Sequence, residues 1–538
     1  MSWMFVIGRI SSHADGSESA SAIRRSLPGQ HGMLPSQLQP PLRVINGRGS
    51  LPRSHRPVNS VHRSLAYSIG GNYFGLVLQL ASAMVLSRLL APAEIGVFAI
   101  AAAISGLARA ARDFGVGEFI IHREQLTERD LRGALALSLA ACWGLGLLIA
   151  ALSPLAARYF REPGIGEVMR VQALSFVLVP FGAVTMAWFQ RQLIPQPQFV
   201  ASILADITSF VVAVGCALQG LGHMSMAWSS LAGVAVTVAA SVWYRPKSLP
   251  CWPSLEGLRD AFEFGKYTGG VNLLVQMARS APELILGRVL NVESVALFSR
   301  ANALVELFQK LVVRSIQPLT LPIFSRSQRE NGSPLAAYLS SVAYVTVLGW
   351  PLLGFLALTA PAAIRLVYGP QWGGAVDLSR VLCAAAAVEL VHRFGREGAL
   401  ARGRSGEANV TSVALQSVRV LGLFAAVPFG LEGACWGLLA AALAGALMQQ
   451  VTLARTLGLR VGDLARSCGR SLVVSVVSCF PLATWLVVDP PSEPDYLLAL
   501  LAGALLTAIT WLPCLFLVRH PLTAEIRVLL VRRWRPQA

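Results

Sequence analysis

The feature that most constrains this chain of 538 residues is a series of long apolar segments separated by short polar ones. A helix needs about 20 mostly apolar residues to cross the hydrocarbon core of a bilayer, whereas barrel strands need only about ten. Fourteen segments have the length of a spanning helix, so we predict an all-α polytopic membrane protein. The segments are 65–90, 95–118, 133–153, 169–190, 199–219, 224–243, 267–290, 295–317, 337–360, 374–393, 408–428, 431–454, 471–488 and 496–518.

The composition agrees with a membrane protein. Charged residues make up 14% of the chain and hydrophobic residues 54%, whereas a soluble globular protein has roughly 25% charged residues. A soluble enzyme, a disordered protein and a disulfide scaffold are therefore excluded. The net charge of +17 would suit a nucleic-acid partner. We predict none, because the basic residues lie between the apolar segments and not on one soluble face.

The distribution of basic residues predicts the orientation in the membrane. Lys and Arg collect in the cytoplasmic segments of membrane proteins. Most of the 45 basic residues fall in the N-terminal tail, in alternate loops and in the C-terminal tail. Both termini are therefore predicted to be cytoplasmic, with an even number of spans.

Three segments outside the spans have their own composition. Residues 1–62 are rich in Ser, Gly, Pro and Arg, which predicts a disordered cytoplasmic tail; the alternative is that translation begins at Met33 or later. Residues 246–266 are predicted to form a cytoplasmic linker, with a short amphipathic helix over Ser254–Lys266. Residues 519–538 form a basic C-terminal tail.

An internal repeat appears when the chain is shifted by 200 residues. The identities include Tyr67 with Tyr267, Asn72 with Asn272, and Arg88 with Arg288. Apolar composition alone would rarely align Tyr, Asn and Arg together. Six spans separate the copies, so both run in the same direction, and an axis along the membrane normal relates such repeats. We predict two six-helix lobes, 65–245 and 267–456, around a central cleft, followed by two extra helices within 471–518.

Ionisable and amide side chains inside the spans are the candidate functional residues. A charge at mid-bilayer costs at least about 2.5–3.5 kcal/mol, so it should face protein or water. A cleft with surplus Arg would favour an anionic substrate. The candidate substrate ligands are Arg279, Arg380, Arg419, Arg109, Asn72 and Asn272. A structural alternative remains open for each, because Arg and acid four residues apart can form a local ion pair and Asn can join helices.

The sequence holds no motif of a known catalytic or cofactor site. HExxH, GxSxG, a Walker loop and paired CxxC motifs are absent, and the eight Cys and eight His are scattered. We therefore predict no cofactor, no metal site, no catalytic residue and no enzymatic activity.

Several stretches resemble the polysaccharide and oligosaccharide flippases of the multidrug/oligosaccharidyl-lipid/polysaccharide exporter superfamily. They are Arg88–Phe98, Asp113–Ile121, Gly287–Ala301, Pro318–Gln328 and Leu366–Trp372. The resemblance covers about residues 65–456, and it implies two lobes around a cationic cavity in the bacterial inner membrane. It also implies a flippase that moves undecaprenyl-pyrophosphate-linked repeat units outward for O-antigen, capsule or exopolysaccharide synthesis by alternating access. A glycan polymerase and glycosyltransferases would then be its partners, beside the lipid-linked glycan and membrane lipids.

Carboxylates within the spans are candidates for coupling such transport to protons or sodium ions. They are Glu283, Asp206 and Glu389. Two other functions stay open at this point. One is a multidrug or cation antiporter of the same superfamily, which an Arg-rich cleft disfavours because it repels cations. The other is a membrane protein of envelope assembly that transports nothing.

Overall fold

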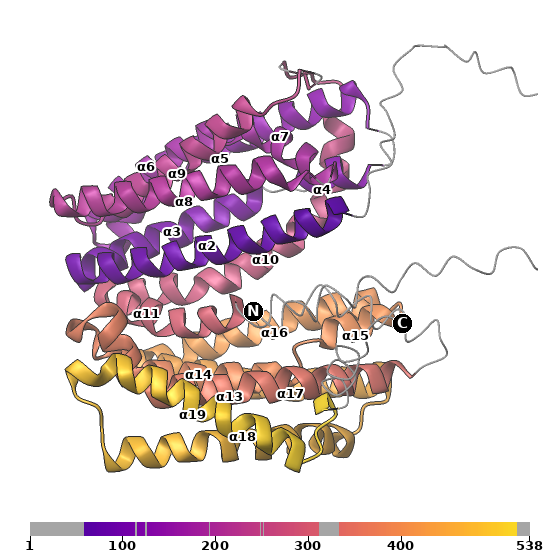
Figure 1. The fold of residues 1–538 in the computed structure, drawn as a ribbon. Helices are drawn as coiled ribbons and strands as arrows, with labels where there is room; N and C mark the ends of the chain where they lie inside the picture. Colours follow the sequence, from indigo (N-terminus) through magenta and orange to yellow (C-terminus); the bar gives the residue numbers. More distant parts are fainter. Residues whose placement is uncertain are drawn as a thin grey trace, which may run out of the picture. The chain divides into compact units, whose positions relative to one another are not determined.

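The computed structural model describes residues 59–523 except 113–115, 124–125, 193, 248, 251 and 311–332. Most of the predicted N-terminal tail and residues 524–538 lie outside this range. The described residues from Val61 to Thr523 belong to one compact unit. Within the described part, the regular structure is helical throughout and contains no strand (Figure 1).

The helices of the first lobe follow the six predicted spans in order. The second and fourth spans are each divided between two helices. The bounds are α2 Asn59–Leu89, α3 Pro92–Arg112, α4 Val116–His122, α5 Glu128–Phe160, α6 Pro163–Leu178, α7 Pro180–Arg191, α8 Pro195–Leu218 and α9 Met224–Trp243. Pro180 lies at the first position of α7, where it cannot donate a hydrogen bond to the preceding turn, and the two helices are bent by 56° at this break.

The helices of the second lobe follow the next six predicted spans. Their bounds are α10 Leu258–Val289, α11 Val292–Phe308, α13 Pro334–Tyr368, α14 Ala375–Val391, α15 Gly395–Ala401, α16 Ser405–Ala426 and α17 Gly430–Leu457. α10 differs from its prediction, because it begins at Leu258 and continues without a break into the span. The helical part of the predicted linker is thus the start of α10 and not a separate helix.

Two further helices, α18 (Val461–Val488) and α19 (Tyr496–Leu517), pack against each other and against α13. Ser467 of α18 donates a hydrogen bond to the Leu339 carbonyl of α13, and Trp511 of α19 donates one to the Val347 carbonyl of α13. These bonds join both helices to α13. His520 follows α19 and is fully buried; its Nδ1 accepts from the Leu522 amide and its Nε2 lies 3.2 Å from Ser471 Oγ. Burial, helped by the charge of Arg470, lowers the pKa of His520 to about 4, so the ring is neutral at physiological pH.

Only some of the fourteen predicted spans correspond to helices that are long and apolar enough to cross a membrane. Eight helical stretches in the described part are long and apolar enough to cross a membrane, and the bent pair α6–α7 makes a ninth if it is taken as one span. One of the eight, Gly406–Leu457, includes both α16 and α17. The described residues of all fourteen predicted ranges are largely helical, but the number of crossings stays a prediction.

The two copies of the sequence repeat begin their second helices at equivalent positions and cap them differently. In the first copy, the Glu94 carboxylate accepts from the Ala91 amide at 2.8 Å. In the second copy, the Asn291 side chain accepts from the Ser294 amide, also at 2.8 Å. A capping box has two such hydrogen bonds, and each copy makes one of them. The two helices thus begin alike although their capping residues differ.

The lobes touch where these repeated helices meet. α3 packs against both α10 and α11, and α5 packs against α10. Gly96 of α3 lies so close to α11 that a Cβ atom there would fall 1.9 Å from the Val292 carbonyl oxygen. Only glycine permits this approach of the two backbones.

Repeat-equivalent arginines cross between the lobes in a matched way. Arg88, at the end of α2, donates to the Leu366 carbonyl of α13 at 2.6 Å. Arg288, at the end of α10, lies over the ring of Tyr159 of α5, 4.7 Å from its centroid. α13 and α5 are the third spans of the two lobes, so each arginine contacts the corresponding helix of the opposite lobe.

A second set of hydrogen bonds reinforces the Arg88 contact. Trp372, which is fully buried, donates from its indole to the Ser87 carbonyl at 3.0 Å. The Gln371 side chain donates to the same carbonyl at 2.5 Å. These bonds join the end of α2 to the segment that follows α13, and they hold the lobes together at that end.

Candidate functional site

A polar cavity of about 430 Å³ lies among helices of the second lobe. α10, α11 and α14–α17 supply its lining in the described part of the chain. α17 gives it room, since Ala441, Ala442, Gly445 and Ala446 present only small side chains to it. The sequence predicted a cleft between the lobes; the described lining of this cavity comes from the second lobe.

The first lobe reaches the edge of this cavity at one described contact. Lys310, two residues beyond the end of α11, lines the cavity, and its Nζ donates to Gln79 Oε1 of α2 at 3.1 Å. The same ammonium group lies 3.7 Å from the Glu306 carboxylate. Lys310 therefore links both lobes to the cavity wall.

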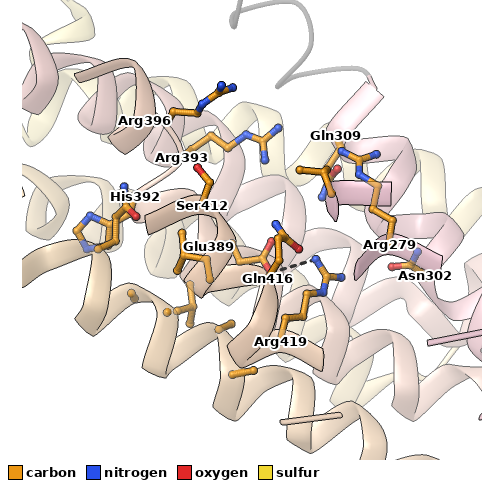
Figure 2. A pocket seen from close by; sticks show the side chains of 18 of the residues that line it. Arg279, Asn302, Gln309, Glu389, His392, Arg393, Arg396, Ser412, Gln416 and Arg419 are labelled. Atoms are coloured by element: carbon orange, nitrogen blue, oxygen red, sulfur yellow. Dashed lines mark ion pairs between the residues drawn. The ribbon is translucent and has the colours of Figure 1, made fainter. Parts of the chain in front are cut away.

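Four of the nine predicted site residues line the cavity: Arg279 and Glu283 on α10, Glu389 on α14 and Arg419 on α16. Arg419 and Glu389 form an ion pair, with 3.8 Å between guanidinium nitrogen and carboxylate oxygen, and both are roughly two-fifths exposed. Figure 2 shows this pair as a dashed line, with Arg279 on another side of the cavity. The sequence did not predict the pair, because its members are thirty residues apart on different helices.

Three other predicted residues lie elsewhere. Arg380 faces a separate groove between α14 and α17 and pairs with Asp377 at 2.9 Å. Arg109 of α3 lies beside Gly106, next to α10, and donates to the Ala102 carbonyl. Asp206 of α8 lies against Gly75 of α2. The side chains of Asn72 and Asn272 lie outside the described residues.

Two arginines that were not among the predicted site residues line the cavity as well. Arg393 and Arg396 follow the end of α14, one on each side of Gly395, where α15 begins. In the view of Figure 2 they lie with His392 on one side of the cavity, opposite Arg279, Gln309 and Asn302. Among the described residues, the structure records no ion-pair partner for either arginine. The sequence reasoning missed them, and the one local signal is the pair of glycines, Gly395 and Gly398, beside them in the chain.

The cavity is positive overall. Its lining includes five basic side chains, Arg279, Lys310, Arg393, Arg396 and Arg419, against three carboxylates, Glu283, Glu306 and Glu389. Asn302, Gln309, Ser412, Gln416 and Gln449 add uncharged polar groups. Guanidinium groups bind phosphate and carboxylate oxygens with two parallel hydrogen bonds, so the lining suits an anion that also carries hydrogen-bonding groups.

No cluster of three or more His, Cys, Asp or Glu that would hold a metal ion occurs in the described residues. Ser412, the hydroxyl side chain in the described lining, donates to the Ala408 carbonyl of its own helix.

The sequence matches the profile of the polysaccharide biosynthesis protein family over residues 85–377. The chain belongs to this family. The matched region runs from the end of α2 to the start of α14, and therefore takes in both cross-lobe arginines and the α10 part of the cavity. Together with its apolar helices, this membership makes the chain a multi-pass membrane protein.

Curated relatives have related names. The chain is 24% identical over 331 residues to the teichuronic acid biosynthesis protein TuaB of Bacillus subtilis, covering 59% of this chain and 66% of the relative. It is 20% identical over 319 residues to the lipopolysaccharide biosynthesis protein WzxC of Escherichia coli, covering 57% and 63%. The succinoglycan biosynthesis transport protein ExoT of Rhizobium meliloti is 24% identical, covering 58% and 63%. The matches span just under two thirds of these relatives.

Solved structures share the fold. The lipid II flippase MurJ, in an inward closed conformation, superposes with a TM-score of 0.70 at 13% identity, covering 83% of this chain and 98% of that one. An inward-facing multidrug resistance transporter of the MATE family gives a TM-score of 0.55 at 17% identity, covering 71% and 95%. The chain therefore has the two-lobed fold of the superfamily predicted from its sequence.

Proposed function

We propose that this protein is a flippase for lipid-linked glycan precursors, with an undecaprenyl-pyrophosphate anchor, in the bacterial inner membrane. It would turn repeat units outward for assembly into a surface polysaccharide, and it would act as a transporter and not as an enzyme. Glycosyltransferases would supply its substrate, and a polymerase would consume its product. Relatives named for teichuronic acid, lipopolysaccharide and succinoglycan support a glycan as the cargo.

The surplus of guanidinium groups in the cavity carries this proposal. A pyrophosphate is the one strongly anionic group common to such precursors, and Arg393 and Arg396 offer bidentate partners that no described carboxylate occupies. A cation antiporter, the second candidate, would need the opposite balance of charge. An assembly protein without transport would have no use for a charged cavity.

The predicted orientation places the cavity toward the cytoplasmic face of the membrane. With the N-terminus in the cytoplasm, α14 ends and α16 begins at the inner face, so Arg393 and Arg396 lie at an inner mouth. The contacts of Arg88, Arg288, Gln371 and Trp372 then lie at the outer ends of α2, α10 and α13. A cavity near one face and closed contacts at the other are what an inward-facing state of alternating access requires.

Depletion of the protein in its host tests the proposal. Loss of surface polysaccharide together with accumulation of lipid-linked glycan in the inner leaflet is the expected result. Unchanged surface polysaccharide, or increased sensitivity to cationic drugs with normal polysaccharide, would favour the antiporter instead.

Removing both cross-lobe arginines should shift the protein toward an outward-facing state. Replacing Arg88 and Arg288 with Ala deletes one charge-assisted hydrogen bond and one cation–π contact, together worth about 2–3 kcal/mol. That free energy changes a conformational equilibrium by roughly 30-fold or more. Nitroxide labels on Cys replacing Leu221 and Phe429, both exposed and one in each lobe, should report longer distances by double electron–electron resonance in a background lacking the eight native cysteines.

Arg365→Ala is the matched control for this experiment. Arg365 also lies near the end of α13, but it donates to the Tyr496 hydroxyl at 3.0 Å and so joins α13 to α19. The label distances should stay unchanged in this variant. Equal distances in the Arg88/Arg288 double variant and the native protein would show that these contacts do not hold the lobes closed.

A further inference from the structure

Gln449 of α17 is a buried polar side chain with an unsatisfied acceptor in the cavity. It lines the cavity yet is only 6% exposed, and its Oε1 has no hydrogen-bond partner in the structure. Glu283, on the facing α10, has an Oε2 atom in the same condition. Buried oxygens rarely remain unpaired, since the loss of their water is not compensated. A ligand or water with hydrogen-bond donors would satisfy both.

Gly395 fixes the place of the Gln449 amide. A Cβ atom on Gly395 would fall 2.0 Å from Gln449 Nε2, so the amide occupies the space that any other residue would fill. Gly395 stands between Arg393 and Arg396 in the chain. The Gln449 amide is therefore held against the backbone of the segment that carries Arg393 and Arg396, and the three side chains line the same cavity.

This combination restricts the chemistry of the ligand. The two guanidinium groups favour an anionic ligand, whereas the unpaired amide oxygen in the same cavity favours a hydrogen-bond donor. A phosphate alone supplies only acceptors at neutral pH, and an ammonium donor would be repelled by the arginines. A neutral hydroxyl attached to an anionic group meets both requirements, and a sugar joined to a phosphate has this arrangement.

We propose that Gln449 is a sugar-reading residue: its amide oxygen accepts a hydrogen bond from a hydroxyl of the first sugar, while Arg393 and Arg396 hold the adjoining pyrophosphate. The proposal rests on the flippase function and assigns the carbohydrate end of its substrate to the wall formed by α17 and Gly395. Gly395 acts through Gln449, as a positioning residue.

Comparing binding of a bare lipid pyrophosphate with binding of its glycosylated derivatives distinguishes recognition of the sugar from recognition of the phosphate. The full-length protein in nanodiscs is titrated with bare undecaprenyl pyrophosphate and with its glucosyl, galactosyl and N-acetylglucosaminyl derivatives. The native protein should bind at least one derivative more tightly than the bare lipid. Gln449→Leu, which keeps the size but removes the acceptor, should weaken binding of that derivative about tenfold and change binding of the bare lipid less than twofold. Gly395→Ala should have the same selective effect, because it displaces the amide.

Gln450→Leu is the matched control. Gln450 is the next residue, its Oε1 is likewise unpaired, and its Nε2 donates to the Leu459 carbonyl away from the cavity lining. This variant should bind every lipid like the native protein. An equal loss of binding for bare and glycosylated lipids in Gln449→Leu would assign the residue a structural role and overturn the proposal, as would no loss at all. If the native protein bound neither kind of lipid, the flippase function itself would fail.

Discussion

Replacing Arg393 and Arg396 together with Gln should abolish polysaccharide export while leaving the amount of folded protein unchanged. Each guanidinium can give charge-assisted hydrogen bonds worth about 1.5–3 kcal/mol to a phosphate, so losing both should weaken binding of undecaprenyl pyrophosphate by about a hundredfold or more. Both side chains are partly or fully exposed and have no described ion-pair partner, so their removal leaves no buried charge behind. Surface polysaccharide in a complemented depletion strain is the measurement.

The matched control removes the same charge a few residues further along the chain. Arg402 and Arg404 lie beyond α15, are exposed, and do not line the cavity. Replacing both with Gln should leave export near the native level. Similar losses in the two double variants would mean that the net charge of this loop matters, through membrane orientation, and that the cavity does not depend on Arg393 and Arg396.

Gly96→Ala should destabilise the contact between the lobes more than any single change on the lipid-facing surface. The added Cβ would fall 1.9 Å from the Val292 carbonyl oxygen. The α3 backbone fixes the position of the Cβ and the α11 backbone that of the oxygen, so neither atom can rotate away as the end of a side chain can. Separating α3 from α11 should cost about 2 kcal/mol or more and lower the thermal unfolding midpoint in detergent.

Gly144→Ala provides the comparison. Gly144 is an exposed glycine within α5, and a Cβ atom there would meet nothing within 4 Å. The substitution should be neutral or slightly stabilising, because alanine favours helix over glycine by up to about 1 kcal/mol. A Gly96→Ala midpoint equal to that of Gly144→Ala would show that α3 and α11 are not packed as closely as the structure has them.

The sequence predicted the helices well because each had to be apolar over a membrane's thickness, which is a strong local signal. The bend at Pro180 was not predicted, although proline marks it, because apolar composition continues through the break. The start of α10 was also placed too late. Its first turns carry Arg259 and Glu263, which pair with each other, so they look unlike a span while still being helical.

The site was predicted only in part, for physical reasons. Arg279, Glu283, Glu389 and Arg419 were found because a charge inside an apolar run needs a polar neighbour. The same rule selected Arg380 and Arg109, which bond to polar groups outside the cavity, and Asp206, which lies against Gly75 of α2. Arg393 and Arg396 follow the end of a helix and resemble loop residues. Gln449 is uncharged. A search for charges inside apolar segments therefore selects none of the three. Which helix faces meet is a property of packing that composition does not contain.

Transport in a reconstituted system tests the central claim most directly. Proteoliposomes carry undecaprenyl-pyrophosphate-linked oligosaccharide in both leaflets, and a membrane-impermeant glycosidase digests what it reaches. The native protein should make nearly all of the glycan accessible, whereas the Arg393/Arg396 double variant should leave about half protected, as in liposomes without protein. Protection of about half the glycan in the presence of the folded native protein would contradict the account.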